Sequence, residues 1–278
     1  MQRENNGDVC YRKEDVNAEQ ISCSFLNDNF YRNLKNIDYE CVTDWKRQRR
    51  GIDIVLKFQS GQKRYVDNKS ANLQWMNSSL DNAAIELSFR VHEKDEYGYN
   101  MYDDNKSPIM KRVDGWFLNP DYATHYYLFY WTSLFEENGF PRFSHHKKTN
   151  YFKYFKKNDI ESEEIMLVEK RILKMWCDYV GLTEERLRYY VSDILKKPAT
   201  GSSSIWNRNI TDAQGRSIKG VVGITRNVLY KERPVLLILN HDIMTELAFL
   251  HCIVTPDKIK DLECPRRSKS KRAFLLHD

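Results

Sequence analysis

The stretch RRGIDIVLKFQSGQKRYVDNKSA, residues 49–71, carries apolar and polar side chains in alternation on both sides of a short polar turn. The tripeptide at residues 59–61 ends in glycine, which a three-residue hairpin loop prefers at its last position because the backbone turns left-handed there. This loop pairs Phe58 with Gln62. The stretch therefore predicts two antiparallel strands joined by a tight hairpin.

The register of this hairpin decides which charged side chains meet. Counting back from the turn places Asp53 directly opposite Asp67, and Lys69 follows two residues later on the same face. The same register gathers the apolar side chains on the other face: Ile52, Ile54, Leu56, Phe58 and Val66. A shift by one residue would separate the two acids and mix the faces. The sequence therefore favours the register that brings two carboxylates and a lysine together.

Such a group has a functional and a purely structural interpretation. Two opposed carboxylates repel each other unless a cation offsets their charge, and oxygen ligands suit Mg²⁺ or Mn²⁺. Lys69 beside them can orient a water or stabilise charge on a phosphate, and Gly51 allows close approach of the chain just before Asp53. The structural alternative is a solvated charge triangle on the open face of the hairpin.

Composition limits the classes of protein to consider. The chain has 278 residues, 41% hydrophobic and 30% charged, with a formal net charge of +5. These values are typical of a soluble globular protein with a sizeable core, and the charge allows a nucleic-acid partner without requiring one. Six scattered cysteines without a CxxC pair and seven histidines without an HxxxH spacing predict reduced thiols and no zinc site.

Neither end of the sequence indicates export or membrane insertion. No apolar run approaches the roughly 20 residues that span a bilayer. The first ten residues are polar and lack the apolar segment of a signal peptide. We therefore expect a cytoplasmic protein without a membrane partner.

Periodicity predicts alternating helices and strands along the chain. A helix is expected from Asn17, which would cap it, with Gln20 three residues later. Further strands are expected at residues 83–91, 115–120, 124–135, 218–227 and 233–240, helices at 163–182, 183–197 and 241–253, and a long loop at 198–217. Asn240 would cap the last helix. We interpret residues 1–254 as one α/β domain with a helical excursion near 160–198, followed by a basic tail at 255–278.

The two strand motifs resemble those of the PD-(D/E)XK nuclease superfamily. Its pattern is an acid on one strand and acid-any-lysine on the antiparallel neighbour, with a helix in front that often supplies a glutamate. GID at residues 51–53 and DNK at 67–69 match these motifs, and the helix from Asn17 precedes them. The run QRRGID and the later GWF and THYYLFYW are similar to bacterial or phage members. The resemblance implies a restriction-endonuclease-like fold, in which helices flank a central mixed sheet.

The resemblance also implies roles for particular residues. Asp53 and Asp67 would bind Mg²⁺ or Mn²⁺ together with the main-chain carbonyl of Asn68, and Lys69 would act on the attacking water. Glu19 would be the catalytic acid of the helix, with Asp28 as the alternative. Glu19 has an equally good structural explanation, because the helix dipole favours an acid in the first turn.

Clusters of basic residues suggest where a nucleic acid would lie. Lys46, Arg47, Arg49 and Arg50 directly precede the first acid and could hold the phosphates beside a scissile bond, although short basic runs are commonly solvated loops. The run HHKKTNYFKYFKK at residues 145–157 mixes cations with aromatic rings that could stack on bases or be buried. RRSKSKR at residues 266–272 could be a nucleic-acid arm or simply a disordered end.

These observations lead to one expected function and two alternatives. We expect metal-dependent hydrolysis of nucleic-acid phosphodiesters, with DNA preferred over RNA because of the family resemblance. The first alternative is a catalytically inactive nuclease-like protein that binds nucleic acid or another partner. The second is a structural domain whose acids make only surface ion pairs. Convergence of Asp53, Asp67 and Lys69 in space distinguishes these possibilities.

Overall fold

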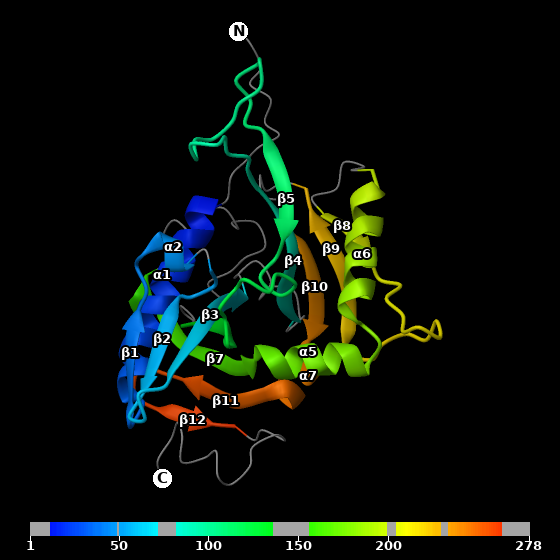
Figure 1. Ribbon diagram of the computed structural model, residues 1–278. Helices are drawn as coiled ribbons and strands as arrows, with labels where there is room; N and C mark the ends of the chain where they lie inside the picture. Colours follow the sequence, from blue (N-terminus) through cyan, green and yellow to red (C-terminus); the bar gives the residue numbers. More distant parts are fainter. Residues whose placement is uncertain are drawn as a thin grey trace. The chain divides into compact units, whose positions relative to one another are not determined.

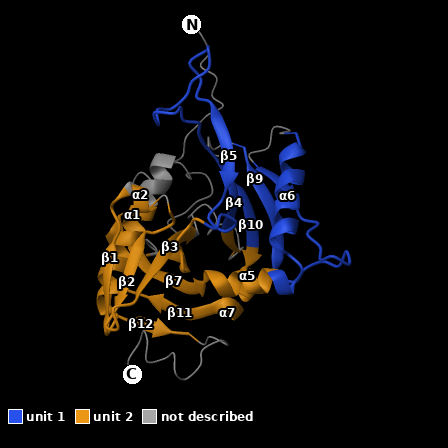
Figure 2. Cartoon of the chain, in the orientation of Figure 1, with its two compact units in different colours: residues 1–11, 85–120, 178–238 blue, residues 12–84, 121–177, 239–278 orange. Residues whose placement is uncertain are grey.

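The computed structural model describes residues 12–48, 50–71, 82–135, 156–198, 204–228 and 233–262. These residues form two compact units, each built from segments that are separate in the sequence (Figure 2). Unit 1 takes residues 85–120 and 178–238, and unit 2 takes residues 12–84, 121–177 and the chain from 239 onward. The interpretation of residues 1–254 as a single domain stays a prediction.

Unit 2 is built on a mixed, curled sheet of seven strands in the order β1-β2-β3-β6-β7-β11-β12 (Figure 1). The strands are β1 (Ile37–Cys41), β2 (Ile54–Phe58), β3 (Lys63–Ala71), β6 (Tyr126–Leu134), β7 (Ile160–Glu169), β11 (Ala248–Val254) and β12 (Ile259–Asp261). Only β3 and β6 run parallel to each other, whereas the other neighbours are antiparallel. The predicted α/β class with a central mixed sheet is confirmed.

The β2–β3 hairpin has the predicted turn and register. Phe58 N donates to the carbonyl of Gln62 at 2.9 Å, and Gly61 has a φ of +79°, in the left-handed region. Ile54 pairs with Val66, so the next residues outward, Asp53 and Asp67, lie opposite each other as expected. Glycine at the end of the loop therefore sets the pairing that the apolar pattern also favours, although Ile52 was wrongly assigned to the face of Ile54 and packs with Val55 instead.

Helix α1 (Arg12–Asn29) covers one face of this sheet. Phe25 and Leu26 on α1 pack with Leu128, Tyr130 and other side chains that alternate strand positions direct to the same face. This apolar burial explains why the helix forms here, as the spacing of Phe25, Leu26 and Phe30 predicts. The predicted cap was wrong, however, because α1 begins at Arg12 and Asn17 lies inside it.

Short helical elements complete unit 2. They are η1 (Tyr31–Asn33), α2 (Trp45–Gln48), η2 (Lys157–Asp159), α5 (Lys170–Tyr179), whose last two residues are in unit 1, and α7 (His241–Leu247). Asn240 caps α7, because its side chain accepts a hydrogen bond from Ile243 N at 3.0 Å, as predicted. Thr245 on α7 contacts Met166, whose side chain points away from α1, so α7 lies on the other face of the sheet.

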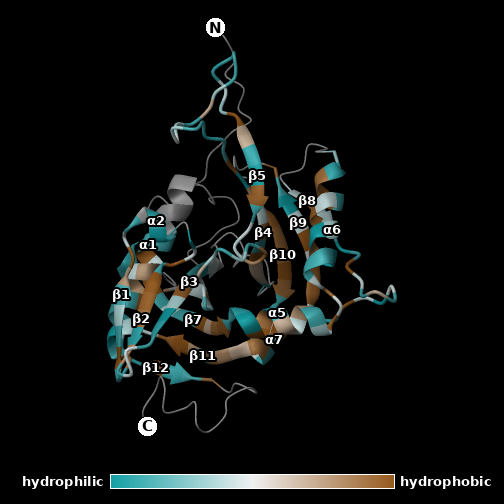
Figure 3. Ribbon diagram, viewed as in Figure 1, coloured by the Kyte–Doolittle hydropathy of each residue, from teal (hydrophilic) through white to brown (hydrophobic). Residues whose placement is uncertain are grey.

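Unit 1 contains most of a second sheet, in the order β5-β4-β10-β9-β8, together with helix α6 (Glu184–Lys196). The strands are β4 (Asn82–His92), β5 (Met110–Asp114), β8 (Ser204–Asn207), β9 (Val221–Asn227) and β10 (Val235–Asn240). Figure 3 shows the central strand β10 as hydrophobic along its length, whereas the edge strand β12 of the other sheet is hydrophilic. A central strand covered on both faces has this continuous apolar character.

Several sequence predictions of secondary structure were wrong. The segment 163–182 was expected to be one helix, but its first part belongs to strand β7 and only α5 is helical. Similarly, the helix expected at 241–253 ends at Leu247, and β11 follows directly. Residues 115–120 form turns rather than a strand, and β8 interrupts the loop expected at 198–217. Short apolar runs do not distinguish a buried strand from a buried helix.

The segment expected to be a basic tail begins with regular structure. Strand β12 pairs with β11 within residues 255–262, and residues 263–278 lie outside the described chain. Among the described residues, no helix is long and apolar enough to cross a membrane.

Candidate functional site

The hairpin brings the three predicted side chains together. Lys69 Nζ lies 2.8 Å from Asp67 Oδ2. Asn68 N donates a hydrogen bond to Asp53 Oδ2 at 2.8 Å. The carboxyl groups of Asp53 and Asp67 also interact, since the charge of Asp53 adds to burial in raising the pKa of Asp67. Convergence of this group, which the sequence predicted from register, is therefore a property of the fold.

Asp67 is an unusual residue because its carboxyl is fully enclosed. It has 0% exposure, and no described residue donates a hydrogen bond to Oδ1. Burial raises its pKa well above the ordinary value, although the charge of Lys69 opposes this shift. Burial also raises the pKa of Asp53, against the opposing effects of Lys69 and of the Asn68 N–H. Two acids held in this way would ionise more readily if a cation lay between them.

Gly51 allows the chain to come close to this group. Its φ is +69°, and a Cβ placed on it would lie 2.3 Å from Thr124 Oγ1 and 3.6 Å from Asp67 Oδ2. Thr124 in turn donates a hydrogen bond to the carbonyl of Gly51 at 2.7 Å. The sequence motif GID therefore needs its glycine for both backbone conformation and space.

Lys170 is a further residue of the group, and the sequence did not indicate it. It is 9% exposed at the start of α5, where its N–H donates to the carbonyl of His125 at 2.9 Å. Burial and the charges of Lys174 and Lys69 lower its pKa to about 8, whereas the charge of Asp67 opposes that shift. The predicted helix at 163–182 hid this position, because Lys170 in fact lies at the junction of β7 and α5.

The structure places the predicted helix acids away from Asp67 and Lys69. Burial raises the pKa values of Cys23 on α1 and of Tyr130 on β6, the charge of Glu19 adds to both shifts, and Tyr130 faces α1. Because side chains alternate along β3, Asp67 and Lys69 point to the opposite face. The participation of Glu19 stays a prediction, and this placement does not support it.

The alternative acid, Asp28, has other partners. It forms ion pairs with Arg32, at 3.1 Å, and with Lys157. These interactions hold the pKa of Asp28 below its usual value, with the hydrogen bond from Lys157 as the main cause. Asp28 is therefore a weaker candidate than its position in the sequence suggests.

Glu163 is a second buried acid, on the α1 face of the sheet. Its Oε1 accepts a hydrogen bond from Thr132 at 3.0 Å, and Thr132 also contacts Ser22 at 3.1 Å. Burial raises its pKa to about 8, which the hydrogen bonds from Ser22 and Thr132 only partly offset. Although it is fully buried, it lies on the face opposite to Asp67, so it does not join Asp67 and Lys69.

Two of the four predicted phosphate-binding residues, Arg47 and Arg50, line a small pocket on the same face as Asp53 and Asp67. The pocket has a volume of about 190 Å³ and is lined by Glu40, Arg47, Arg50, Ile52, Val55, Lys63, Tyr65 and Ala123. Val55 and Tyr65 form the strand pair directly after Asp53 and Asp67 on the same face, about 7 Å along the strands. The pocket with its three cations, Arg47, Arg50 and Lys63, therefore lies further along the face of the hairpin that carries the two acids.

The pocket acid Glu40 is balanced by two cations. Arg47 lies 2.7 Å and Lys57 3.0 Å from its two carboxylate oxygens. Lys46, which was also expected to bind phosphate, is exposed on α2 and does not line the pocket, and Arg49 lies outside the described residues. The pocket can accept an anion through Arg50 and Lys63, with Arg47 partly occupied by Glu40.

The structure contains one group of mixed nitrogen and oxygen donors within the described residues. Glu164, His241 and His251 offer ligand atoms that lie within 4.8 Å of one another. The sequence predicts no zinc site here, since these residues have no motif spacing. Only the pairing of β11 with β7 brings two of them together.

Two predicted basic runs lie mainly outside the described residues: residues 145–155 of the run at 145–157, and the whole run at 266–272.

Comparison with known protein families, with curated proteins and with solved structures finds no match for this chain.

Proposed function

We propose that this protein is a metal-dependent nuclease of the restriction-endonuclease-like type that hydrolyses DNA. The observation that supports it is the convergence of Asp53, Asp67 and Lys69 at a predicted register. Asp67 adds a buried carboxylate oxygen that accepts no hydrogen bond from the described residues, which fits an oxygen-ligated cation.

The chemistry follows from the positions of these residues. Asp53 and Asp67, with the carbonyl of Asn68, would hold Mg²⁺ or Mn²⁺. The ion would supply positive charge against the charge that develops on the phosphate. Lys69 orients the attacking water, whose oxygen bonds to phosphorus as the bond to the leaving oxygen breaks. Lys170 adds a second ammonium group near Asp67, and the basic pocket holds a neighbouring phosphate.

A cleavage assay tests this proposal. The purified chain is incubated with supercoiled plasmid, single-stranded DNA and RNA in Mg²⁺ or Mn²⁺, and Lys69→Ala is compared with wild type. We expect cleavage of DNA by wild type and a loss of at least about 100-fold in Lys69→Ala, because removing one positioned hydrogen-bond donor or charge at a reaction centre typically costs this much.

Lys260→Ala is the matched control, since it removes an exposed lysine from the edge strand β12 of the same sheet. It should cleave like wild type. Equal activity of Lys69→Ala and wild type would show that the proposed site does not carry the activity.

A nucleic-acid-binding protein without turnover is the second candidate. The observation that favours it is the position of Glu19 on the α1 side of the sheet, opposite to the face of Asp67 and Lys69, so that its part in the site stays a prediction. DNA binding that weakens in Arg50→Ala, without cleavage in either metal, would support this candidate instead.

A further inference from the structure

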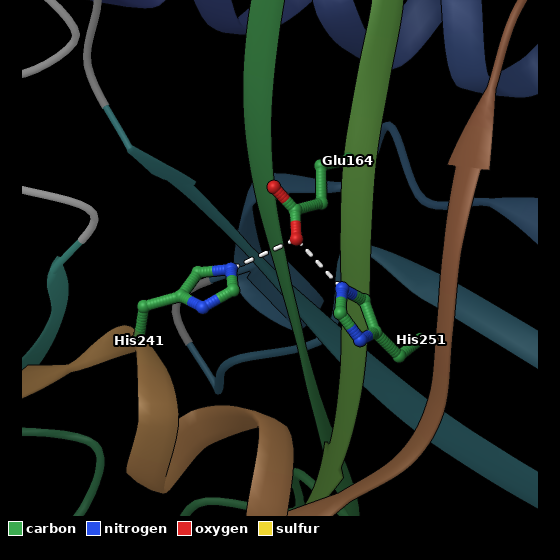
Figure 4. A group of neighbouring side chains, drawn as sticks. All are labelled: Glu164, His241 and His251. Carbon is green, nitrogen blue, oxygen red and sulfur yellow. Dashed lines mark hydrogen bonds and ion pairs between the residues drawn. The ribbon is translucent and has the colours of Figure 1, made fainter. Parts of the chain in front are cut away.

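A second group of side chains converges on one point of unit 2, from three different elements. His241 at the start of α7 and His251 on β11 both direct Nε2 at the same oxygen of Glu164 on β7 (Figure 4). The distances from Glu164 Oε1 are 2.8 Å to His241 and 2.6 Å to His251. One histidine is enough to hydrogen-bond a carboxylate oxygen, so the presence of two at Glu164 Oε1 needs an explanation.

The protons on the two histidine rings can be exchanged for a metal ion. Each Nε2 that donates to Oε1 carries a proton, which a divalent metal displaces when it binds the same nitrogen. His251 is 6% exposed, and no described residue hydrogen-bonds its Nδ1. Within the described part of the chain, the hydrogen bond that orients the His251 ring is the one from Nε2 to Glu164. The arrangement leaves both imidazoles oriented toward a common centre.

The surrounding fold holds these donors in place. Glu164 and His251 lie on paired neighbouring strands, because Ile253 is opposite Glu164 and Met166 is opposite His251. The ring of His241 packs edge-on against Trp131 and lies 5.9 Å from the ring of His251, centroid to centroid. Donors fixed on strands and packed rings lose little conformational freedom when they bind an ion.

We propose that Glu164, His241 and His251 form a Zn²⁺ site with an open coordination position. Two imidazoles and one carboxylate suit Zn²⁺, whereas Mg²⁺ prefers oxygen ligands alone. The side chains of Glu164 and His241 are 30% and 27% exposed, so water can reach the ion. The Nδ1 of His241 lies 3.5 Å from Thr245 Oγ1, which can accept its proton once Nε2 binds the metal.

This site is separate from the acids of the hairpin. Lys69, Phe129, Met166 and His251 lie side by side on four successive strands, with their side chains on the same face. Three strand spacings separate the α-carbons of Lys69 and His251 by about 14 Å. The Zn²⁺ site does not rest on the proposed nuclease activity, because its donors and its position differ.

Metal analysis of the full chain tests the proposal. Chelator-treated protein is titrated with Zn²⁺ by calorimetry, and its bound zinc is counted after dialysis. We expect one Zn²⁺ per chain in wild type. His241→Asn and Glu164→Gln should weaken binding by more than about 100-fold, because even losing a group that only orients a ligand costs roughly 10- to 100-fold.

His92→Asn is the matched control, since His92 lies in unit 1 and contacts Tyr102 rather than this group. It should bind Zn²⁺ like wild type. Less than one zinc per wild-type chain, or unchanged affinity in His241→Asn, would overturn the proposal.

A measurement on wild type covers the case in which the variants fail to fold. Addition of Co²⁺ should broaden the ring resonances of His241 and His251 in the NMR spectrum and leave those of His92 sharp. Broadening of other histidines in place of these two would also overturn the assignment.

Discussion

Gly51 shows how a single residue connects local backbone conformation to the candidate site. We predict that Gly51→Ala destabilises the protein by about 2 to 4 kcal/mol. A left-handed backbone costs an alanine about 1 to 2 kcal/mol, and forcing Thr124 away from a Cβ only 2.3 Å distant adds the cost of overpacking. The measurement is the free energy of unfolding in urea.

Gly61 provides the comparison, because it has a similar φ of +79° and no atom within 4 Å of an added Cβ. Gly61→Ala should therefore cost only the backbone share, about 1 kcal/mol. If both substitutions cost the same, the close approach of Thr124 contributes nothing measurable.

At the scale of elements, the β2–β3 hairpin was the most predictable part of the molecule. Its register depends on a turn of three residues and on alternation within 23 residues, so all the information is local. The local sequence is therefore sufficient to predict that Asp53, Asp67 and Lys69 lie together. The structure places them as expected and adds the burial of Asp67, which no local pattern predicts.

The elements that the sequence missed are those decided by distant contacts. β7 and β11 are apolar segments that pair with each other across about 80 residues of chain, and each was interpreted as part of a helix. Their pairing brings His251 next to Glu164. Because β7 ends at Glu169, Lys170 begins α5 and lies near Asp67. Both observations required the sheet order, which single-sequence periodicity does not provide.

Helix α7 positions one of the proposed zinc ligands, and its cap is therefore testable. Asn240→Ala should cost about 1 kcal/mol of stability, because Ile243 N loses the hydrogen bond from the helix start. His241 is the first residue of α7, so Zn²⁺ should also bind more weakly. Urea unfolding in chelator and zinc titration measure the two effects separately.

Asn240→Asp is the control, since aspartate caps a helix about as well as asparagine. It should retain stability to within a few tenths of a kcal/mol. Equal loss in both variants would mean that the amide of Asn240 acts through some contact other than the cap.

At the scale of the whole molecule, unit 2 carries both candidate sites on one face of one sheet. The order β3-β6-β7-β11 places the oxygen-rich group at β3 and the histidine group at β7 and β11. The chain leaves unit 2 twice between β3 and β11 and returns each time. Segments that are far apart in the sequence therefore contribute to each site. Asp53, Asp67 and Lys69 are the exception, because one hairpin supplies all three.

The two sites should bind their metals independently. Each ion, at 100 times its dissociation constant, stabilises the folded protein by about 2.7 kcal/mol. We predict that the shifts in unfolding free energy from Zn²⁺ and Mg²⁺ add, because sites about 14 Å apart exceed the range of roughly 7 to 10 Å over which perturbations usually couple. The carboxylates of Asp53 and Asp67 also neutralise the charge of Mg²⁺, which limits repulsion between the two ions.

Two variants assign each shift to its site. His241→Asn should abolish the stabilisation by Zn²⁺ and keep that by Mg²⁺, whereas Asp67→Asn should do the reverse. Urea unfolding with each ion alone and with both ions measures the three shifts in unfolding free energy. Loss of both shifts in either variant would show that the groups act as one site. If Zn²⁺ but not Mg²⁺ stabilises the wild-type protein, the hairpin acids are not a metal site. The zinc proposal would be unaffected, because the two groups share no donor atom.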